Sequence, residues 1–473
     1  MVKQSRLSRS SHVRFRNSQG SEAQGSLVRL SRQQVVFEVY NPYSIVQLSE
    51  VLQELRIRQG ERESYRGRAV VTGLLNTGLM LIVSASLVDP WSDLQGLQPG
   101  KLLRSFVRDF VDDWEAATER LREPFQVSVG NLRNYLQELS RWLEHWETEA
   151  NLAAAGTPDA LRREFVADVD HEVGPRLMEL YAIFENAVAE VPRKVVPYHR
   201  AFAQRELHPL MMSSPFMHRA FNKPLGYAGD YEMVRMMLSD PWEGGNTFAK
   251  LLNASALRHE APAAHRNRIA LLQEALEGEA ERVLRASPEA TVGEGGAVQF
   301  LNLGCGPAVE VRRFCEATAL AEQTHFRLVD FNEETLRHVD TSLIPACLAR
   351  RPGMQIATEQ RSVHELIQTS VEGEQETPAQ YDMVYCAGLF DYFRDTTCGF
   401  LLELFYTWVK PGGMVLVTNV TPHHSSRGLM GLVLDWNLEL RDQQGMRELA
   451  PDLGQQRTYE DATGVNVFLE IRK

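Results

Sequence analysis

The stretch Leu301-Asn-Leu-Gly-Cys-Gly-Pro-Ala308 decides the fold, because it joins a predicted buried strand to a predicted helix. The strand begins at Val298, and the glycines follow it directly. Glycine has no Cβ, so a turn of this composition lets the backbone approach a bound ligand closely. The turn therefore predicts a ligand-binding loop, with Gly304, Cys305 and Gly306 as its candidate contacts.

An acidic residue ends the second predicted strand, His325–Asp330, 24 positions after Gly306. Neighbouring parallel strands end at the same edge of a sheet, so the Asp330 carboxylate is expected beside the glycine loop. There it would accept hydrogen bonds from the ribose hydroxyls of a nucleoside cofactor, with a helix N-cap as the alternative role. Phe331, the next residue, is a further candidate for cofactor binding.

Strands and helices alternate through the rest of the chain. Tyr381–Cys386 predicts a strand, residues 396–409 a helix, and Met414–Asn419 the next strand. Two extended runs, Arg457–Glu460 and Val465–Ile471, predict a closing hairpin. The fold class is therefore α/β, a Rossmann-like doubly wound sheet with a C-terminal antiparallel hairpin.

These motifs resemble class I S-adenosylmethionine (SAM) methyltransferases. Leu301–Gly306, Leu328–Asp330, Tyr381–Val384 and Lys410–Gly413 stand in that family's order, and the resemblance covers roughly residues 255–473. It implies that SAM is the cofactor and that the chain is a methyltransferase.

A narrower resemblance joins Ser214–Phe216, Lys223–Tyr231, Ala387–Tyr392 and Asp435–Trp436. Together they look like the bacterial extracellular-factor (3-hydroxypalmitic acid methyl ester) biosynthesis proteins, over about residues 205–473. This likeness implies a small-molecule acceptor, a lipid-like carboxylic acid of the 3-hydroxy fatty acid type, and a methyl ester product of the kind used in quorum sensing. The alternatives are O- or N-methylation of another metabolite, and a regulatory protein that only binds SAM.

The segment Lys223–Tyr231 is predicted to form a lid over the cofactor, within a cap of residues 205–250. Its dense Gly, Pro and aromatic content favours a shaped loop over a regular helix. Tyr227, Gly229 and Tyr231 are expected to cover SAM, and Asp230 to lie near its sulfonium or ammonium group. The alternative is a structural loop between helical regions.

Other cofactor and acceptor contacts are predicted around the fourth strand. Gly388 and Leu389 follow it, where the methyltransferase family contacts adenine and the methionine moiety. Lys223 and Arg219 are candidates for pairing with a substrate carboxylate, with a surface role as the alternative.

The apolar segment 428–440 is expected to form a wall of the acceptor pocket, unless it is an ordinary buried helix. A carboxylate acceptor needs no general base. A hydroxyl or amine acceptor would need one, for which His423, His424 and Tyr392 are the candidates. No cluster of Asp, Glu and His has metal-ligand spacing, so no metal is expected.

The N-terminal part predicts a flexible basic tail (residues 1–20) and then a small β-barrel-like domain (21–95). Its runs Gly25–Ser31 and Val35–Tyr40 faintly resemble PilZ domains, but the arginine pair of those domains is missing, so no cyclic di-GMP binding is expected. The uncharged run 69–88 is interrupted by Asn76-Thr77-Gly78, which favours a hairpin over a membrane span.

Residues 100–200 predict a helical domain, from the apolar spacing in 101–114, 132–143 and 158–188. Gly174-Pro175 is expected to kink or break the last helix. The aromatic stripe of these helices is expected to be core, and a homodimer through the helical region is the alternative.

Composition narrows the function classes. Lysine and arginine total 50 against 62 aspartates and glutamates, so the net charge of −12 disfavours nucleic-acid binding. The five cysteines form no C-x-x-C pair, which indicates neither zinc nor disulfides. With no apolar run behind the basic N-terminus, the expected location is the cytoplasm.

Overall fold

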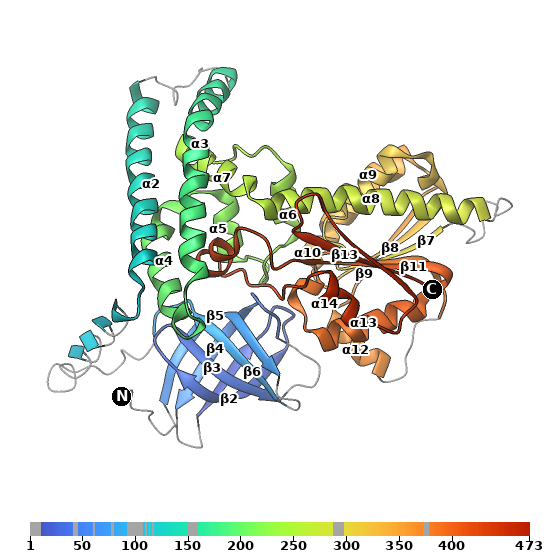
Figure 1. Cartoon of the computed structure of the whole chain (residues 1–473). Coiled ribbons are helices and arrows are strands. Elements are labelled where there is room, and N and C mark those ends of the chain that lie inside the picture. Colours follow the sequence, from blue (N-terminus) through green and yellow to red (C-terminus); the bar gives the residue numbers. More distant parts are fainter. Residues whose placement is uncertain are drawn as a thin grey trace.

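The computed structural model shows a barrel, a helical region and a layered sheet, in chain order (Figure 1). In Figure 1 the barrel (blue) lies beneath the upright green helices, and the sheet extends to one side of them. The described residues are 11–40, 46–59, 62–76, 80–91, 107–108, 111–112, 114–115, 118–149, 159–286, 298–371 and 378–473.

The N-terminal strands close into a barrel with the order β1-β2-β3-β6-β5-β4, in which β1 also pairs with β4. Alternating residues point inward, as Val35, Phe37 and Val39 do, and all three are buried. The prediction of a small β-barrel-like domain is confirmed, and so is the hairpin of β5 and β6. The strands are β1 (His12–Arg16), β2 (Glu22–Leu30), β3 (Gln34–Tyr40), β4 (Val51–Gln59), β5 (Arg62–Asn76) and β6 (Met80–Leu87).

The predicted flexible tail is wrong where it overlaps β1. Val13 and Phe15 are buried inside the barrel, while the alternating residues Arg14 and Arg16 face outward. Their period of two is that of a strand, and the surrounding arginines and serines concealed it. Residues 1–10 of the predicted tail lie outside the described residues.

The helical region packs one continuous core from α2 to α7. Leu132, Leu136, Leu139 and Leu143 of α2 are buried as predicted, whereas Trp142 is 48% exposed and belongs to the outer face. The helices are α2 (Glu123–Glu149), α3 (Asp159–Ala189), η1 (Arg193–Val195), α4 (Val196–Met211), α5 (Pro215–Asn222), α6 (Tyr231–Leu238), α7 (Thr247–Arg258) and α8 (Glu260–Ala286).

Of the kink or break predicted at Gly174-Pro175, the break does not occur, because α3 continues through it. Proline removes one helical hydrogen bond, but Leu177, Tyr181 and Phe184 beyond it are buried in the same core. Tertiary packing therefore outweighs the local preference. Most of the predicted helix at 101–114 lies outside the described residues.

The cap segment is more helical than expected, since α5 and α6 flank the short loop 223–230. Their first residues follow strong N-caps. The Ser214 hydroxyl accepts from Met217 N, and the Asp230 carboxylate accepts from Glu232 N and Met233 N. The density of Gly, Pro and aromatic residues hid these two starts in the sequence.

The C-terminal sheet has, within the described residues, seven strands in the order β12-β13-β11-β10-β7-β8-β9. The strands are parallel except β13, which runs antiparallel to β11 and β12. The predicted Rossmann-like sheet with a C-terminal hairpin is therefore confirmed. The strands are β7 (Val298–Leu303), β8 (Thr324–Asp330), β9 (Gln355–Gln360), β10 (Tyr381–Cys386), β11 (Val409–Val420), β12 (Gln455–Glu460) and β13 (Asn466–Arg472).

Helices cover both faces of the sheet (Figure 1). One core holds side chains of α8 and α9, and the other those of α12, α13 and α14. No helix in the described part of the chain is long and apolar enough to cross a membrane. The elements are α9 (Val309–Ala317), η2 (Ala319–Gln323), α10 (Glu333–His338), η3 (Val339–Leu343), α11 (Ile344–Arg350), α12 (Val363–Val371), η4 (Phe390–Tyr392), α13 (Asp395–Trp408), η5 (Leu429–Val433) and α14 (Gln443–Glu448).

A buried ion pair fastens the three regions together. Arg200 of α4 donates from Nη1 to the Ser86 hydroxyl of β6 at 2.9 Å. Its Nε lies 3.1 Å from Oδ1 of Asp435, which follows η5. Both charged side chains are less than 10% exposed, so each needs the other.

We expect Arg200→Leu to lower the free energy of unfolding by about 3–5 kcal/mol, because it leaves the Asp435 carboxylate buried and unpaired. Adding Asp435→Asn should restore part of the loss. Arg176→Leu, which breaks the exposed pair with Glu179, should cost less than about 1 kcal/mol. Urea unfolding of the four proteins measures this, and equal losses in the two single variants would contradict it.

Candidate functional site

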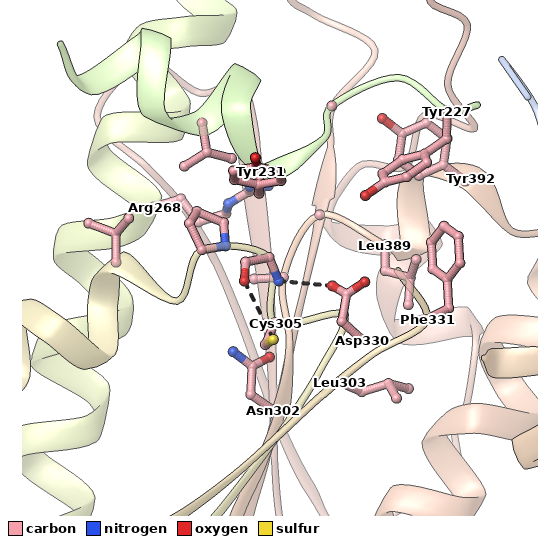
Figure 2. A pocket seen from close by; sticks show the side chains of 18 of the residues that line it. Tyr227, Tyr231, Arg268, Asn302, Leu303, Cys305, Asp330, Phe331, Leu389 and Tyr392 are labelled. Carbon is pink, nitrogen blue, oxygen red and sulfur yellow. Dashed lines mark hydrogen bonds between the residues drawn. The ribbon is translucent and has the colours of Figure 1, made fainter. Parts of the chain in front are cut away.

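A deep cavity opens at the carboxyl ends of β7, β8 and β10, beneath the loop 223–230 (Figure 2). All nine predicted cofactor contacts line it. They are Tyr227, Gly229, Gly304, Cys305, Gly306, Asp330, Phe331, Gly388 and Leu389. The sequence thus identified the floor of this cavity and much of its cover.

The glycine loop is fixed to the end of β8. Gly304 N and Cys305 N both donate to the Val329 carbonyl, at 2.8 and 3.0 Å. Gly304 has φ of +69°, and a Cβ there would lie 3.2 Å from the Leu389 side chain. The backbone conformation therefore favours glycine at this position, and a larger residue would also have to displace the Leu389 side chain.

Asp330 holds the loop from the other side. Its Oδ2 accepts from Gly306 N at 3.1 Å, and its Oδ1 accepts from Asn332 N at 2.9 Å. The residue is only 6% exposed, and burial raises the pKa of its carboxyl to about 6. The site can therefore change the charge of this side chain just below neutral pH.

The loop 223–230 covers the cavity with aromatic and small residues. The Tyr227 ring lies 5.0 Å from the Phe331 ring, centroid to centroid. Burial and the nearby Asp330 raise the pKa of the Tyr227 phenol, so it stays protonated. Gly229 has φ of +75°, and a Cβ there would lie 2.9 Å from the Tyr392 hydroxyl. The lid is thus tightly fitted to the sheet edge.

Asp230 has a different role from the one predicted. It lines neither this cavity nor the neighbouring one. Its carboxylate caps α6, and Nε of Arg219 donates to both of its oxygens, at 2.9 and 3.1 Å. Asp230 therefore stabilises the lid rather than approaching the cofactor, and Arg219 is already occupied.

Tyr231 and Tyr392 lie in the cavity wall. The Tyr231 hydroxyl donates to Glu334 Oε1 at 2.9 Å, which ties the lid to α10. The Tyr392 hydroxyl donates to the Ala228 carbonyl and accepts from Trp436 Nε1, each at 3.0 Å. Burial also raises the pKa of the Tyr392 phenol above its ordinary value. Tyr392 is therefore suited to positioning other groups and not to acting as a general base.

A second cavity adjoins the first and is mostly apolar. The two share Gly229, Val234, His265, Arg268, Gly388 and Tyr392. Leu429, Met430, Leu434, Trp436 and Leu438 form one wall of the second cavity, as predicted for segment 428–440. This segment is a short π-helix followed by irregular chain, rather than an ordinary buried helix.

The two predicted histidines lie outside both cavities. His424 is buried, and burial lowers its pKa to about 4, so it is neutral. Lys223 is buried too, and its ammonium donates to the Leu434 carbonyl at 2.9 Å. The sequence-based roles of His423 and His424 as bases and of Lys223 as a carboxylate partner therefore find no support here.

Sequence reasoning missed the contribution of α8 and of the barrel. His265 and Arg268 stand three positions apart on α8 and line both cavities. Their helical spacing was a usable signal, since it places two polar side chains on one face of a helix before the first strand. Gln19 and Gln47 of the barrel also line the cofactor cavity, and nothing in the sequence indicated this.

The barrel loops are held against the lid by hydrogen bonds. Val51 N donates to the Gly226 carbonyl at 2.8 Å, and the Ser49 hydroxyl donates to the Asn437 carbonyl at 2.8 Å. Buried Glu50 accepts from Ser18 N and from Gln47 N, each at 2.8 Å. It thereby joins the loop between β1 and β2 to the segment before β4. The barrel is therefore part of the cavity wall.

Among the residues that the structure describes, no group of three or more His, Cys, Asp or Glu side chains is placed to hold a metal ion.

No protein-family profile matches the chain, and neither does any curated protein. A possible exported protein from Bordetella parapertussis is 17% identical, with a TM-score of 0.41 over 54% of this chain and 86% of that one. Magnesium protoporphyrin IX methyltransferase from Synechocystis PCC 6803 with bound SAH is 10% identical, with a TM-score of 0.31 over 45% and 87%. An O-methyltransferase family protein from Burkholderia thailandensis is 16% identical, with a TM-score of 0.31 over 46% and 62%. Similarities this low do not identify the activity, which has to be argued from the site.

We expect SAM affinity to depend on the charge of Asp330. The ionised carboxylate accepts hydroxyl hydrogen bonds and the protonated form loses acceptors, so affinity should be full above about pH 7, be about halved at pH 6 and be roughly tenfold lower at pH 5. Asp330→Asn should weaken binding by about 1.5–3 kcal/mol and remove the pH dependence between pH 5 and 7. Calorimetric titration with SAM measures both, and an unchanged affinity in the folded variant would contradict the ribose assignment.

Asp230→Ala should lower the free energy of unfolding by about 0.5–2 kcal/mol, because α6 loses its N-cap. Asp230→Asn keeps a capping oxygen and should lose less. Urea unfolding distinguishes the two variants. Equal stability of wild type and Asp230→Ala would show that the cap is not needed.

Proposed function

We propose that this chain is a SAM-dependent methyltransferase that converts a small apolar carboxylic acid to its methyl ester. The observation that carries the proposal is the pair of joined cavities. One has the glycine loop and the acidic strand end of a nucleoside site, and the other is mostly apolar. They meet at Gly229 and Gly388, which line both cavities.

The residues present fit SAM. The Asp330 carboxylate would accept from the ribose hydroxyls, beside Gly304 and Gly306. Asn302 lines the same cavity, and its Oδ1 is buried with no hydrogen-bond partner among the described residues. An unpaired buried acceptor is costly, and the ammonium group of the methionine moiety would satisfy it.

SAM, when bound, supplies a methyl group on a positively charged sulfur. The protein orients the two reactants and excludes water from them. The lid, with Tyr227 over Phe331, excludes water, and Tyr392 holds the Ala228 carbonyl so that the lid stays closed on the sheet edge. Methyl transfer is an in-line displacement, for which orientation of the two reactants is the main requirement.

The junction of the cavities favours an acceptor that is already ionised. His265 is the histidine there, and burial together with Arg268 and Arg266 holds its pKa well below the usual range. It is therefore a weak base, and Tyr392 is a weaker candidate still. A carboxylate needs no proton removed, since it is ionised at neutral pH.

A hydroxylated chain is supported by the polar atoms of the apolar cavity. His259 Nε2 and Asn466 Oδ1 are buried there without a partner among the described residues. A hydroxyl group can donate a hydrogen bond to the Asn466 oxygen and accept one from the His259 nitrogen. Together with the likeness to the extracellular-factor proteins, this favours a 3-hydroxy fatty acid.

Two further proposals concern the setting of the enzyme. All five cysteines are free and buried, which supports a reducing cytoplasm. Trp142 and Trp146 on the outer face of α2 are about half exposed, which supports a homodimer through the helical region. The PilZ-like character of the barrel stays a prediction from sequence.

Incubation with SAM carrying an isotopically labelled methyl group tests the activity. With a panel of 3-hydroxy fatty acids, mass spectrometry should find labelled methyl esters, and Asp330→Asn should form far less. Label in an amine or an ether instead would replace the acid with another acceptor. SAM binding without transfer to any member of the panel or of a cell-extract metabolite pool would favour a regulatory protein.

A further inference from the structure

Arg268 lies where the two cavities meet. It belongs to α8, lines both cavities and is 8% exposed. A Cβ on Gly388 would come within 2.9 Å of its Nη2 and 3.0 Å of its Nη1. The guanidinium thus lies flat against the Gly388 backbone, in the passage between the cavities.

Among the residues that the structure describes, no carboxylate lies next to the Arg268 guanidinium to balance its charge. Its Nη2 contacts His265 Nδ1 at 2.7 Å, and that imidazole is neutral because its pKa is strongly lowered. Asp391 and Glu310 attract the guanidinium only at longer range. Both have other partners, since Asp391 accepts from Val420 N and Glu310 accepts from the Tyr385 hydroxyl.

The other buried arginines of the described chain show what a balanced guanidinium looks like. Arg200 pairs with Asp435. Arg441 pairs with Asp395 and also donates to two backbone carbonyls and to Asn419 Oδ1. Arg268 has no equivalent partner in the described ranges, and a buried, unpaired cation is unfavourable. Its environment is therefore suited to an incoming anion.

The partner that best matches a guanidinium is a carboxylate, because the planar fork of N–H groups meets both oxygens. Two carboxylates could reach this place, that of the acceptor and that of SAM. Of the described residues that line the apolar cavity, Arg268 is the only lysine or arginine. The methyl group must cross the passage beside Gly388, so the attacking oxygen has to lie there too.

We propose that Arg268 binds the carboxylate of the acceptor and thereby restricts the enzyme to carboxylic acids. This inference rests on the proposed function. Both carboxylate oxygens pair with the guanidinium fork, and the remaining lone pair of one of them forms the bond to the methyl carbon. The carbon–sulfur bond breaks, its electron pair stays on sulfur, and a neutral ester and a neutral thioether result without proton transfer.

The first test uses the wild-type protein and compares binding of 3-hydroxydecanoate with binding of its methyl ester and its primary amide. The acid should bind at least tenfold more tightly than either uncharged analogue. Because no variant is involved, equal binding of the three molecules overturns the proposal directly.

The second test uses Arg268→Gln and Arg268→Lys. Arg268→Gln should lose the preference for the acid, and Arg268→Lys should keep part of it, since the charge remains but the fork is lost. The SAM dissociation constant, measured by calorimetry without acceptor, should change less than threefold. The matched control is Arg285→Gln, an exposed arginine on the same helix, which should behave as wild type.

Two outcomes overturn the assignment. A tenfold loss of SAM affinity in Arg268→Gln, with the acid preference intact, would mean that Arg268 holds the carboxylate of SAM. If Arg268→Gln changes neither the preference for the acid nor the affinity for SAM, Arg268 binds neither ligand and has only a structural role. Failure of the proposed function gives a different result, namely no labelled methyl group on any acceptor even though the acid preference depends on Arg268.

Discussion

The site depends on the hydrogen bonds that the end of β8 accepts from the glycine loop. The Val329 carbonyl and the Asp330 carboxylate together accept hydrogen bonds from Gly304 N, Cys305 N and Gly306 N, so successive backbone amides of the loop are fixed by one strand. Parallel pairing of β7 with β8 brings these groups together. Without that register, the loop would have no defined position under the lid.

The lid is held by hydrogen bonds to parts of the chain on either side of it. The loop 223–230 is hydrogen-bonded to the barrel through Gly226, and to Tyr392 of η4 through Ala228. Arg200 links the barrel to Asp435, next to Trp436 of the apolar cavity. A barrel built this closely into the wall differs from a sensor attached by a linker, because any shift of its loops reaches Gln19, Gln47 and the lid.

Burial sets the charge of each group in the site. Burial raises the pKa of the Asp330 carboxyl and lowers that of the His265 imidazole, which stays neutral. Arg268 is charged, with no carboxylate of the described residues beside it. These three side chains come from β8 and α8, and the same low-polarity surroundings act on all of them. A carboxylate acceptor complements this arrangement, since it brings the missing negative charge and requires no base.

The sequence by itself determined the Rossmann-like sheet, the glycine loop and Asp330, because strand periodicity and turn glycines are local properties that adjacent residues express. It also located the apolar wall at 428–440. The tertiary structure alone decided that Asp230 caps α6, that Lys223 bonds the Leu434 carbonyl, and that His265 and Arg268 stand between the cavities. The tertiary structure also decided that the basic segment His12–Arg16 forms the barrel strand β1. Those outcomes depend on which distant partner each side chain meets and how far it is removed from water, and neither is encoded in a residue's immediate neighbours.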